Sequence, residues 1–522
     1  MSATRRTVVR SSVLLAGLTA VSQVLGFGRD AVMAAVFGAS SSVDAFLVAQ
    51  GLMSVVLGLI TGAMARGLIP PVARAVDVGN VAAGHRTVRV SLTVTVMVLV
   101  AGSVLMFVAT KPLLSVLAPG FDAATADEAV RLTRIVLLAT VFIAGTNLLA
   151  AAAQAHGKFF WSGIQGIPFN IIMIACAVLL GGQFGVGALA VGFVVGSVAR
   201  FLFQLPAVTT IRLKLRPSLR LRDPGFREVL ALVPPLLVGS AILNVNTMVD
   251  RAVGSAQGAG TIASLSYGWR IVTLAEVVLV TAFTTTLFPA FSTLGDPSRR
   301  AHLRRTTERV LGVTLVLITP VVIVLAIAAK PIVVLLLARG NFDARAVELT
   351  TLAVSLYAVA LAGLAVREVV ARTCLAVGDS RTPVLTALAA MAVNVAGDLT
   401  LGVRYGVSGL AASTSLSVLV AAVMLSVLTA RRHRAVALKP LGRTVVAVLT
   451  ASVVSAAAGW LVLRAVDVRD AVHALLALGA TGTVCLASYT VVVVALRVPA
   501  LAELRASLHD LRLRKTPPAP PD

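Results

Sequence analysis

The chain has 522 residues, of which 58% are hydrophobic and only 13% are charged, and its formal net charge is +23. A soluble domain carries about 25% charged residues, so this composition excludes an ordinary water-soluble fold. The basic residues stand in clusters between apolar runs, as in the loops of membrane proteins, and no segment is long enough to form a soluble basic domain. We therefore expect a membrane protein with no nucleic acid partner.

Long apolar runs recur along the whole chain. About 20 apolar residues, rising about 1.5 Å each, cross the ~30 Å hydrocarbon core of a bilayer. We therefore predict an all-α polytopic membrane protein with about 14 transmembrane helices. Their predicted residues are 12–36, 42–66, 88–112, 129–153, 160–182, 185–208, 227–252, 262–290, 307–336, 347–366, 382–402, 406–430, 444–465 and 471–496.

The first of these runs follows the basic segment Met1–Arg10. It is longer than the apolar region of a cleaved signal peptide, so we interpret it as a retained first span. With an even number of spans, most loop Lys and Arg residues fall on the side of the N-terminus, which predicts that both termini are cytoplasmic. The cysteines lie in or beside apolar runs and are interpreted as packing residues without a disulfide or a metal: Cys176, Cys374 and Cys485.

The sequence also repeats itself at a constant spacing of 221 residues. The matching pairs are Phe121-Asp122 with Phe342-Asp343, Gly157 with Gly378, and Gly185-Val186 with Gly406-Val407. Both copies contain six spans in the same orientation, which predicts two six-helix lobes related by a pseudo-two-fold axis along the membrane normal, as in many transporters. The predicted parts are an N-terminal lobe (1–210), a C-terminal lobe (225–430), two extra helices (444–496) and a cytoplasmic tail (497–522).

Arginines near the ends of the predicted spans are assigned to the loops, and three are assigned to the spans themselves: Arg29, Arg251 and Arg270. An arginine at mid-membrane costs about 2.5–3.5 kcal/mol on insertion scales, so such a residue indicates function. Arginine also binds phosphate groups through a bidentate fork. Asp30 and Asp250 adjoin two of these arginines, but adjacent helical residues do not face each other, so we expect such pairing to be poor.

A second polar group is predicted in the C-terminal lobe. Asn394 and Asp398 are four residues apart and share one face of a helix, Thr414 lies on the next span, and Asp250 on the seventh. Carboxylate, amide and hydroxyl oxygens suit a hard cation, with Na⁺ and H⁺ both open. The alternative is a set of interhelical hydrogen bonds that only holds the lobe together.

Enzymatic signatures are absent from the sequence. There is no nucleotide-binding G-x-x-x-x-G-K-[ST] and no H-E-x-x-H, and no nucleophile elbow, and the six histidines are not clustered along the chain. We therefore predict a transporter without a nucleotide cofactor, and not an enzyme.

Several stretches resemble a known family. From Val24 the sequence reads VLGFGRDAVMAAVFGASSSVDAFLVAQ, and from Thr61 it reads TGAMARGLIPPVARA. Together with Met248–Leu294, RGNFDARAVELT from Arg339 and ARTCLAVGDSRTPV from Ala371, these blocks resemble the MurJ/MviN-type lipid II flippases of the MOP exporter superfamily. The resemblance extends over residues 10–430 in order, and identifies a divergent member.

This resemblance implies a V-shaped pair of lobes in a bacterial plasma membrane, with a central cationic cavity. The implied function is alternating-access transfer of an undecaprenyl-diphosphate-linked peptidoglycan precursor from the inner to the outer leaflet. Helices 13 and 14 are implied to form a groove for its lipid tail, and the expected partners are this anionic lipid-linked sugar, membrane lipids and cell-wall synthesis proteins. The alternatives are a flippase for another polyprenyl-diphosphate oligosaccharide, a multidrug/cation antiporter, or a scaffold that transports nothing.

The resemblance also implies roles for particular residues. Arg29 and Arg270 resemble cavity arginines, whereas other positions depart from the family: Gln23 and Val56 stand where arginines are usual, Gly51 where a lysine is, and Thr61 and Trp269 where acids are. The expected substrate-binding residues are Arg29, Arg270, Arg251, Asp44 and Gln23.

Two further assignments follow from the resemblance. Asp44 resembles an aspartate near the outer face, which either pairs with a cavity arginine or caps the second helix. Asp250, Asn394, Asp398 and Thr414 resemble a sodium site, to which the carbonyl of Leu410 adds a fifth ligand.

Overall fold

The computed structural model describes residues 3–292, 300–436, 438–466, 468 and 470–498. The chain divides into two compact units: the first is Met1–Tyr267 with Leu337–Ala346, and the second is Gly268–Leu336 with Val347–Asp522. This division differs from the lobes predicted from the repeat, which remain a prediction. Every regular element within the described residues is helical.

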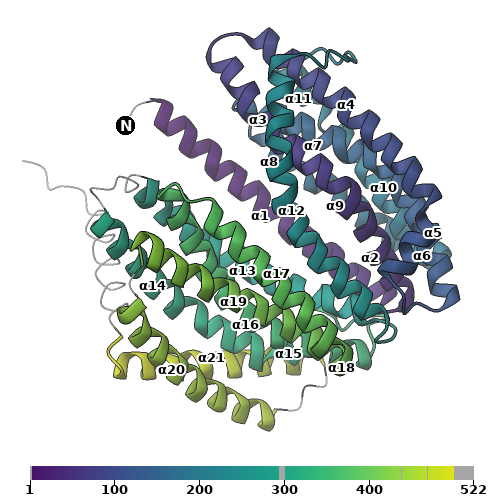
Figure 1. Cartoon of the computed structure of the whole chain (residues 1–522). Helices are drawn as coiled ribbons and strands as arrows, with labels where there is room; N and C mark the ends of the chain where they lie inside the picture. The colour runs from purple at the N-terminus through teal and green to yellow at the C-terminus, as the bar shows by residue number, and fades with distance from the viewer. Residues whose placement is uncertain (1–2, 293–299, 437, 467, 469, 499–522) are drawn as a thin grey trace, which may run out of the picture. The chain divides into compact units, whose positions relative to one another are not determined.

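The first unit is built on long helices joined by short turns (Figure 1). Its elements are α1 (Ala3–Phe37), α2 (Ser41–Met53), the π-helical η1 (Ser54–Gly58), α3 (Leu59–Asp77), α4 (Val81–Val108), α5 (Thr110–Leu117), α6 (Ala123–Val136), the 3₁₀ turn η2 (Leu137–Ala139), α7 (Thr140–Ala155), α8 (Phe160–Ile164), α9 (Gly166–Phe184), α10 (Gly187–Leu202), α11 (Leu205–Thr210) and α12 (Pro224–Ser255). One core of this unit gathers Leu68 from α3, Val88 from α4, Leu148 from α7 and Phe226 from α12.

The second unit holds most of α13 (Thr261–Ser292), whose first turns belong to the first unit. Its other elements are α14 (Arg300–Ile327), α15 (Ala329–Leu337), α16 (Ala344–Ala376), α17 (Arg381–Gly397), the π-helical η4 (Asp398–Gly402), α18 (Val403–Tyr405), α19 (Val407–His433), α20 (Leu438–Ala465) and α21 (Ala471–Ala495). Figure 1 shows α20 and α21 side by side in yellow, where both pack against α14. Tyr489 of α21 fixes this packing by donating a hydrogen bond of 3.1 Å to the carbonyl of Val316.

Eleven helical stretches among the described residues are long and apolar enough to cross a membrane. They confirm the all-helical polytopic class that the composition predicts. Each coincides with one of the 14 predicted spans, and the remaining three predicted spans, 42–66, 227–252 and 262–290, lie on α2–α3, α12 and α13. The count of 14 therefore stays a prediction.

Local structure recurs at the repeat spacing. Asp122 caps α6 by accepting a hydrogen bond from the amide of Thr125, and Asp343 accepts one from the amide of Ala346 in the first turn of α16. Gly185 and Gly406 have nearly the same backbone conformation, with φ of 53° and 59°, before α10 and α19. The three cysteines are free thiols.

Candidate functional site

Arg29 lies on α1 and is half-buried. Its guanidinium is bound to the neighbouring carboxylate, with Nη2 2.7 Å and Nε 3.0 Å from Oδ1 of Asp30. The expectation that adjacent residues pair poorly is therefore wrong here, because the long arginine side chain reaches around the helix to its neighbour. Asp30 neutralises part of the charge that Arg29 offers to an anion.

Arg200, on α10, is a cation that the sequence reasoning missed. From the sequence it belongs with the loop arginines, because it stands near the end of the predicted span 185–208. In the structure Nη2 donates a hydrogen bond of 3.1 Å to Oδ1 of Asn147 on α7, and Nε is enclosed without an acceptor. No carboxylate among the described residues forms an ion pair with it, so its charge is not neutralised within this part of the chain.

One aromatic ring brings these two arginines into the same neighbourhood. The guanidinium carbons of Arg29 and Arg200 each lie 5.8 Å from the ring centre of Phe169 on α9. A cation over an aromatic face is attracted by its quadrupole. Phe169 itself is buried and packs edge-on against Phe193, with ring centres 5.4 Å apart. A buried aromatic ring therefore contacts both positive side chains.

Arg251, on α12, occupies space that a side chain at position 51 would fill. A Cβ built on Gly51 of α2 would lie only 1.1 Å from Nη1 of Arg251. The glycine therefore admits the guanidinium against the backbone of α2. Arg251 and Gly51 were singled out separately in the sequence, and the structure joins them.

The other predicted cavity positions have varied surroundings. Gln23 is half-buried on α1. Thr61 of α3 donates a hydrogen bond of 3.0 Å to the carbonyl of Leu57 in the preceding π-helical η1. Val56 lies in the π-helical η1, and its side chain falls outside the described ones. Trp269 packs edge-on against Tyr357 with ring centres 5.1 Å apart, which makes it a packing residue. Arg270 is half-buried on α13 and belongs to the second unit.

Asp44 caps a different helix from the one the sequence suggests. Its Oδ2 accepts from the amide of Gly260 and its Oδ1 from the amide of Ala263, both at 2.7 Å, so it caps the start of α13. The carboxylate is 2% exposed. The alternative that Asp44 caps α2 is wrong, because the cap of α2 is Ser40, which accepts from the amide of Val43. Pairing of Asp44 with a cavity arginine when the outer mouth closes stays a prediction.

Backbone contacts near Asp44 connect the same segments, and we call these contacts together with the Asp44 cap the Asp44 joint. The amide of Asn341 donates to the carbonyl of Ala35 at 2.8 Å, and its side-chain amide donates to the carbonyl of Val36 at 2.6 Å. Gly260 and Gly340 approach the backbone of α1 and its following turn so closely that a Cβ on either would lie 2.2 Å from a carbonyl oxygen. The end of α1 is therefore tied to the segments that lead into α13 and α16.

The predicted oxygen cluster is compact within the second unit. Asn394 donates from Nδ2 to both carboxylate oxygens of Asp398 at 3.1 and 3.2 Å, and Thr414 donates to the carbonyl of Leu410 at 3.1 Å. The sequence reasoning missed Ser413, which bonds to Asp398 and to the Leu410 carbonyl, the latter at 2.9 Å.

Two members of this cluster are fully buried, and the cluster lies beside a local irregularity of the helix. Asn394 and Asp398 are 1% and 0% exposed, and Asp398 opens the π-helical η4. Such π turns occur frequently at functional sites. Asp250, the remaining predicted ligand, belongs to the first unit, and its place in a sodium site stays a prediction.

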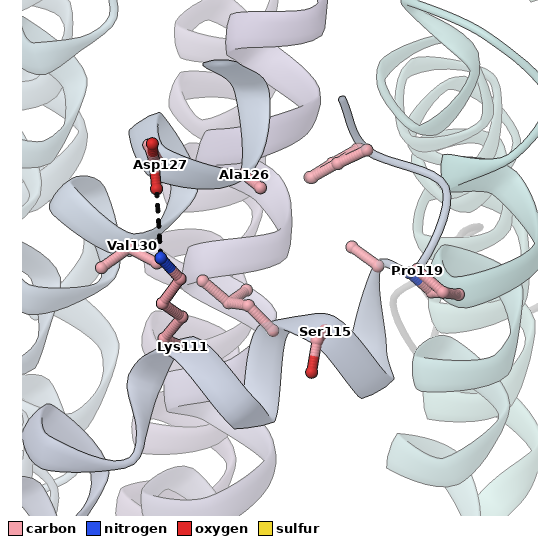
Figure 2. Close-up of a pocket in the computed structure, with 9 residues that line it drawn as sticks. Lys111, Ser115, Pro119, Ala126, Asp127 and Val130 are labelled. Atoms are coloured by element: carbon pink, nitrogen blue, oxygen red, sulfur yellow. Dashed lines mark ion pairs between the residues drawn. The ribbon is translucent and has the colours of Figure 1, made fainter. Parts of the chain in front are cut away.

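A hollow on the first unit lies apart from all of these residues (Figure 2). It is lined by α5, α6 and the turn between them, and Lys111 and Asp127 face each other across it at 4.0 Å. None of the predicted site residues lines it, so we do not assign the transported substrate to this hollow.

The fold and these polar groups are those of a polytopic membrane protein, and the family that the chain matches makes it a transporter and not an enzyme. The family model "Lipid II flippase MurJ" matches residues 33–479. The chain belongs to the MurJ lipid II flippase family.

Individual relatives agree with this assignment. The chain is 28% identical to "Probable lipid II flippase MurJ" of Vibrio cholerae over 78% of this chain and 80% of that protein. It is 27% identical to "Lipid II flippase MurJ" of Burkholderia cenocepacia over 74% and 76% of the two chains.

Solved structures share the fold. A lipid II flippase MurJ in an inward closed conformation superposes with a TM-score of 0.77 at 20% identity, covering 93% of this chain and 99% of that one. An inward-facing multidrug resistance MATE family transporter of the MOP superfamily gives a TM-score of 0.65 at 16% identity, covering 79% and 95%. At these identities the likeness concerns the fold alone.

Proposed function

We propose that this chain carries lipid II, an undecaprenyl-diphosphate-linked peptidoglycan precursor, from the inner to the outer leaflet of a bacterial plasma membrane by alternating access. The proposal is supported by the family match over residues 33–479 and by relatives that carry this name. The structural observation that carries it is the group of arginines inside the helices, because a diphosphate is an anion that must leave water on its way through the membrane.

The arginines differ in what they offer to this anion. Arg29 shares its charge with Asp30, whereas Arg200 has no acidic partner among the described residues. A buried cation without a counter-charge is costly unless a ligand supplies the charge. Arg200 is therefore our candidate for the residue that gains most from the diphosphate, with Arg29, Arg251 and Arg270 as further contributors.

Depletion of the protein followed by lipid analysis tests the cargo. We expect lipid II to accumulate on the cytoplasmic leaflet, where an outside enzyme or probe does not reach it. Normal distribution of lipid II together with a different trapped polyprenyl-diphosphate intermediate would refute lipid II and support the second candidate, a flippase for another oligosaccharide. The residues that favour this second candidate are Gln23 and Val56, which stand where the family usually has arginines.

Substitution of the arginines tests how the cargo is bound. Each charge-assisted hydrogen bond contributes about 1.5–3 kcal/mol, which is about 10- to 100-fold in binding at about 1.4 kcal/mol per factor of ten. We expect Arg200→Ala and Arg270→Ala to lose transport by this factor and the corresponding lysine variants to lose less, because a point charge replaces a fork. The matched control is Arg212→Ala, which removes an exposed arginine. Full activity of both alanine variants in complementation would contradict the binding role.

We further propose that Na⁺ binds the oxygens of Asp398, Asn394, Thr414, the Leu410 carbonyl and Asp250, with H⁺ as the alternative ion. Ser413 joins this set because its hydroxyl already contacts Asp398. A gradient-driven cation would reset the transporter, since one charge crossing 100 mV supplies about 2.3 kcal/mol. Sodium-specific stabilisation of the purified protein, compared with potassium and choline, tests the ion, and its absence would refute sodium.

The proposed topology has 14 spans with both termini in the cytoplasm, and α20 and α21 as the groove for the lipid tail. Cysteines introduced one at a time test it with a membrane-impermeant reagent. We expect positions Ser41 and Val468 to react from outside, and Ser218 and Ala435 only from inside. Reaction of position 218 from outside would overturn this orientation.

A further inference from the structure

Two histidine rings face each other at one end of the first unit. His85 lies in the first turns of α4 and His156 directly follows α7, and their ring centres are 5.4 Å apart with an angle of 32° between the planes. Helices α4 and α7 pack side by side in this unit (Figure 1). The two histidines are 71 positions apart in the sequence, which gave no sign of this pairing.

The same ring atom is left without a partner in both histidines. Nε2 of His85 and Nε2 of His156 are enclosed, and neither has a hydrogen-bond partner among the described residues. Buried polar atoms are normally hydrogen-bonded, so an orphan pair of this kind calls for an explanation. A bound ligand that both atoms share is one such explanation.

The hydrogen bond made by the other ring nitrogen, Nδ1, determines which nitrogen of each histidine carries the proton. Nδ1 of His156 lies 2.8 Å from the carbonyl oxygen of Ala152, and a carbonyl only accepts, so Nδ1 must donate. A backbone hydrogen bond with Ile211 also acts on the His85 ring. Since Nε2 of His85 has no partner, we assign this bond to Nδ1. In the neutral rings both Nε2 atoms then present bare lone pairs, which is how metal-binding histidines are held by their outer hydrogen bonds.

We propose that His85 and His156 bind a divalent transition metal ion of the zinc class between their Nε2 atoms. An ion about 2.0–2.1 Å from each nitrogen lies about 3.2 Å from each ring centre, so at a tetrahedral angle the two centres are about 5.2 Å apart. The observed separation of 5.4 Å fits this geometry. Imidazole nitrogen is a preferred ligand of zinc, copper, nickel and cobalt.

The surroundings define what kind of metal site this is. No group of three or more His, Cys, Asp or Glu suited to a metal occurs among the described residues, so the two histidines would be the only such ligands there and water would have to fill the other coordination positions. The nearby positive charge of Arg89 acts on His85 and opposes a cation, and Arg86 is held by Asp223 at 3.1 Å. The bound ion would join the start of α4 to the end of α7.

Cobalt titration of the untagged full-length protein tests the site, because the chain has only six histidines. We expect visible Co²⁺ absorption that saturates at one ion per chain and disappears when Zn²⁺ is added. His85→Gln and His156→Gln should each weaken Co²⁺ binding by about tenfold or more, since even outer-shell changes cost 10- to 100-fold. The matched control, His473→Gln, removes an exposed histidine that contacts Asp470 and should bind Co²⁺ like the wild type.

Arg89→Gln separates a metal from an anion. Removal of this positive charge should tighten Co²⁺ binding, whereas an anion held by protonated histidines and Arg89 would bind more weakly. The same variants are therefore followed by melting temperature in inorganic phosphate. Saturable Co²⁺ binding that is lost in both histidine variants and tightened in Arg89→Gln supports the proposal. Absence of Co²⁺ binding, binding unchanged in the histidine variants, or stabilisation by phosphate in place of the metal would overturn it.

Discussion

The Asp44 joint offers a perturbation whose size follows from the structure. Asp44→Ala removes the acceptor of two amide hydrogen bonds of 2.7 Å and leaves the amides of Gly260 and Ala263 buried without a partner. Asp44→Asn keeps one acceptor oxygen at nearly the same shape. The first turn of α13 should therefore open more often in the alanine variant than in the asparagine variant.

The magnitude comes from the charge and the burial of this carboxylate. Hydrogen bonds to charged groups contribute about 1.5–3 kcal/mol each, while replacing a helix cap by alanine costs about 0.5–2 kcal/mol. Because Asp44 is only 2% exposed, we take about 1.5 kcal/mol for each bond, a value that lies in both ranges, and therefore about 3 kcal/mol for the two bonds together. At about 1.4 kcal/mol per factor of ten, local opening becomes about 100-fold more frequent in Asp44→Ala and about tenfold in Asp44→Asn.

Hydrogen exchange of the purified protein measures this opening directly, since buried amides exchange through local unfolding. Peptides that cover residues 258–266 should exchange faster by these factors in the two variants. The matched control is Asp470→Ala, which removes an exposed cap from the amides of Val472 and His473 and should leave residues 258–266 unchanged. Wild-type exchange rates at 258–266 in Asp44→Ala would refute the joint as we describe it.

Three further predictions follow from other contacts. Gly51→Ala should lower the thermal stability by about 1 kcal/mol relative to the control Gly62→Ala, whose Cβ would meet nothing nearer than 3.8 Å, because the new methyl group must displace the Arg251 guanidinium. An added Arg251→Ala change should remove this difference, and equal stability of the two glycine variants would contradict the contact. Asp398→Ala should abolish any sodium-specific rise in melting temperature while cargo binding persists, and an unchanged rise would exclude Asp398 as a ligand. The hydrogen bond from the Thr382 hydroxyl, together with bonds from backbone amides and from His433, holds the pKa of Asp379 well below its usual range. The contribution of ionised Asp379 to the free energy of unfolding is therefore present above about pH 4 and is lost as pH falls toward the lowered pKa. In Asp379→Asn the melting temperature should therefore change less with pH on the acid side than in the wild type. The same dependence of melting temperature on pH in both proteins would contradict this.

The class of the protein was determined by local features of the sequence. Hydropathy is averaged over consecutive residues of one helix and needs no knowledge of how helices pack. It therefore located every span that the structure bears out. The oxygen cluster was predicted in part for the same reason, because Asn394 and Asp398 are four residues apart and share a face whatever surrounds them. The family followed from short blocks of residues that stay together along the chain.

The tertiary structure alone decided which distant residues meet. Asp44 binds an amide 216 positions away, Arg251 fits against the backbone at Gly51, and Arg200 reaches the ring that Arg29 also contacts. Sequence periodicity gives a side chain its face on a helix and its depth in the membrane, but its partner depends on how that helix is rotated and packed against others. Helix packing is fixed by the sum of many small contacts along the whole length of each helix, and for this reason no single motif in the sequence encodes it.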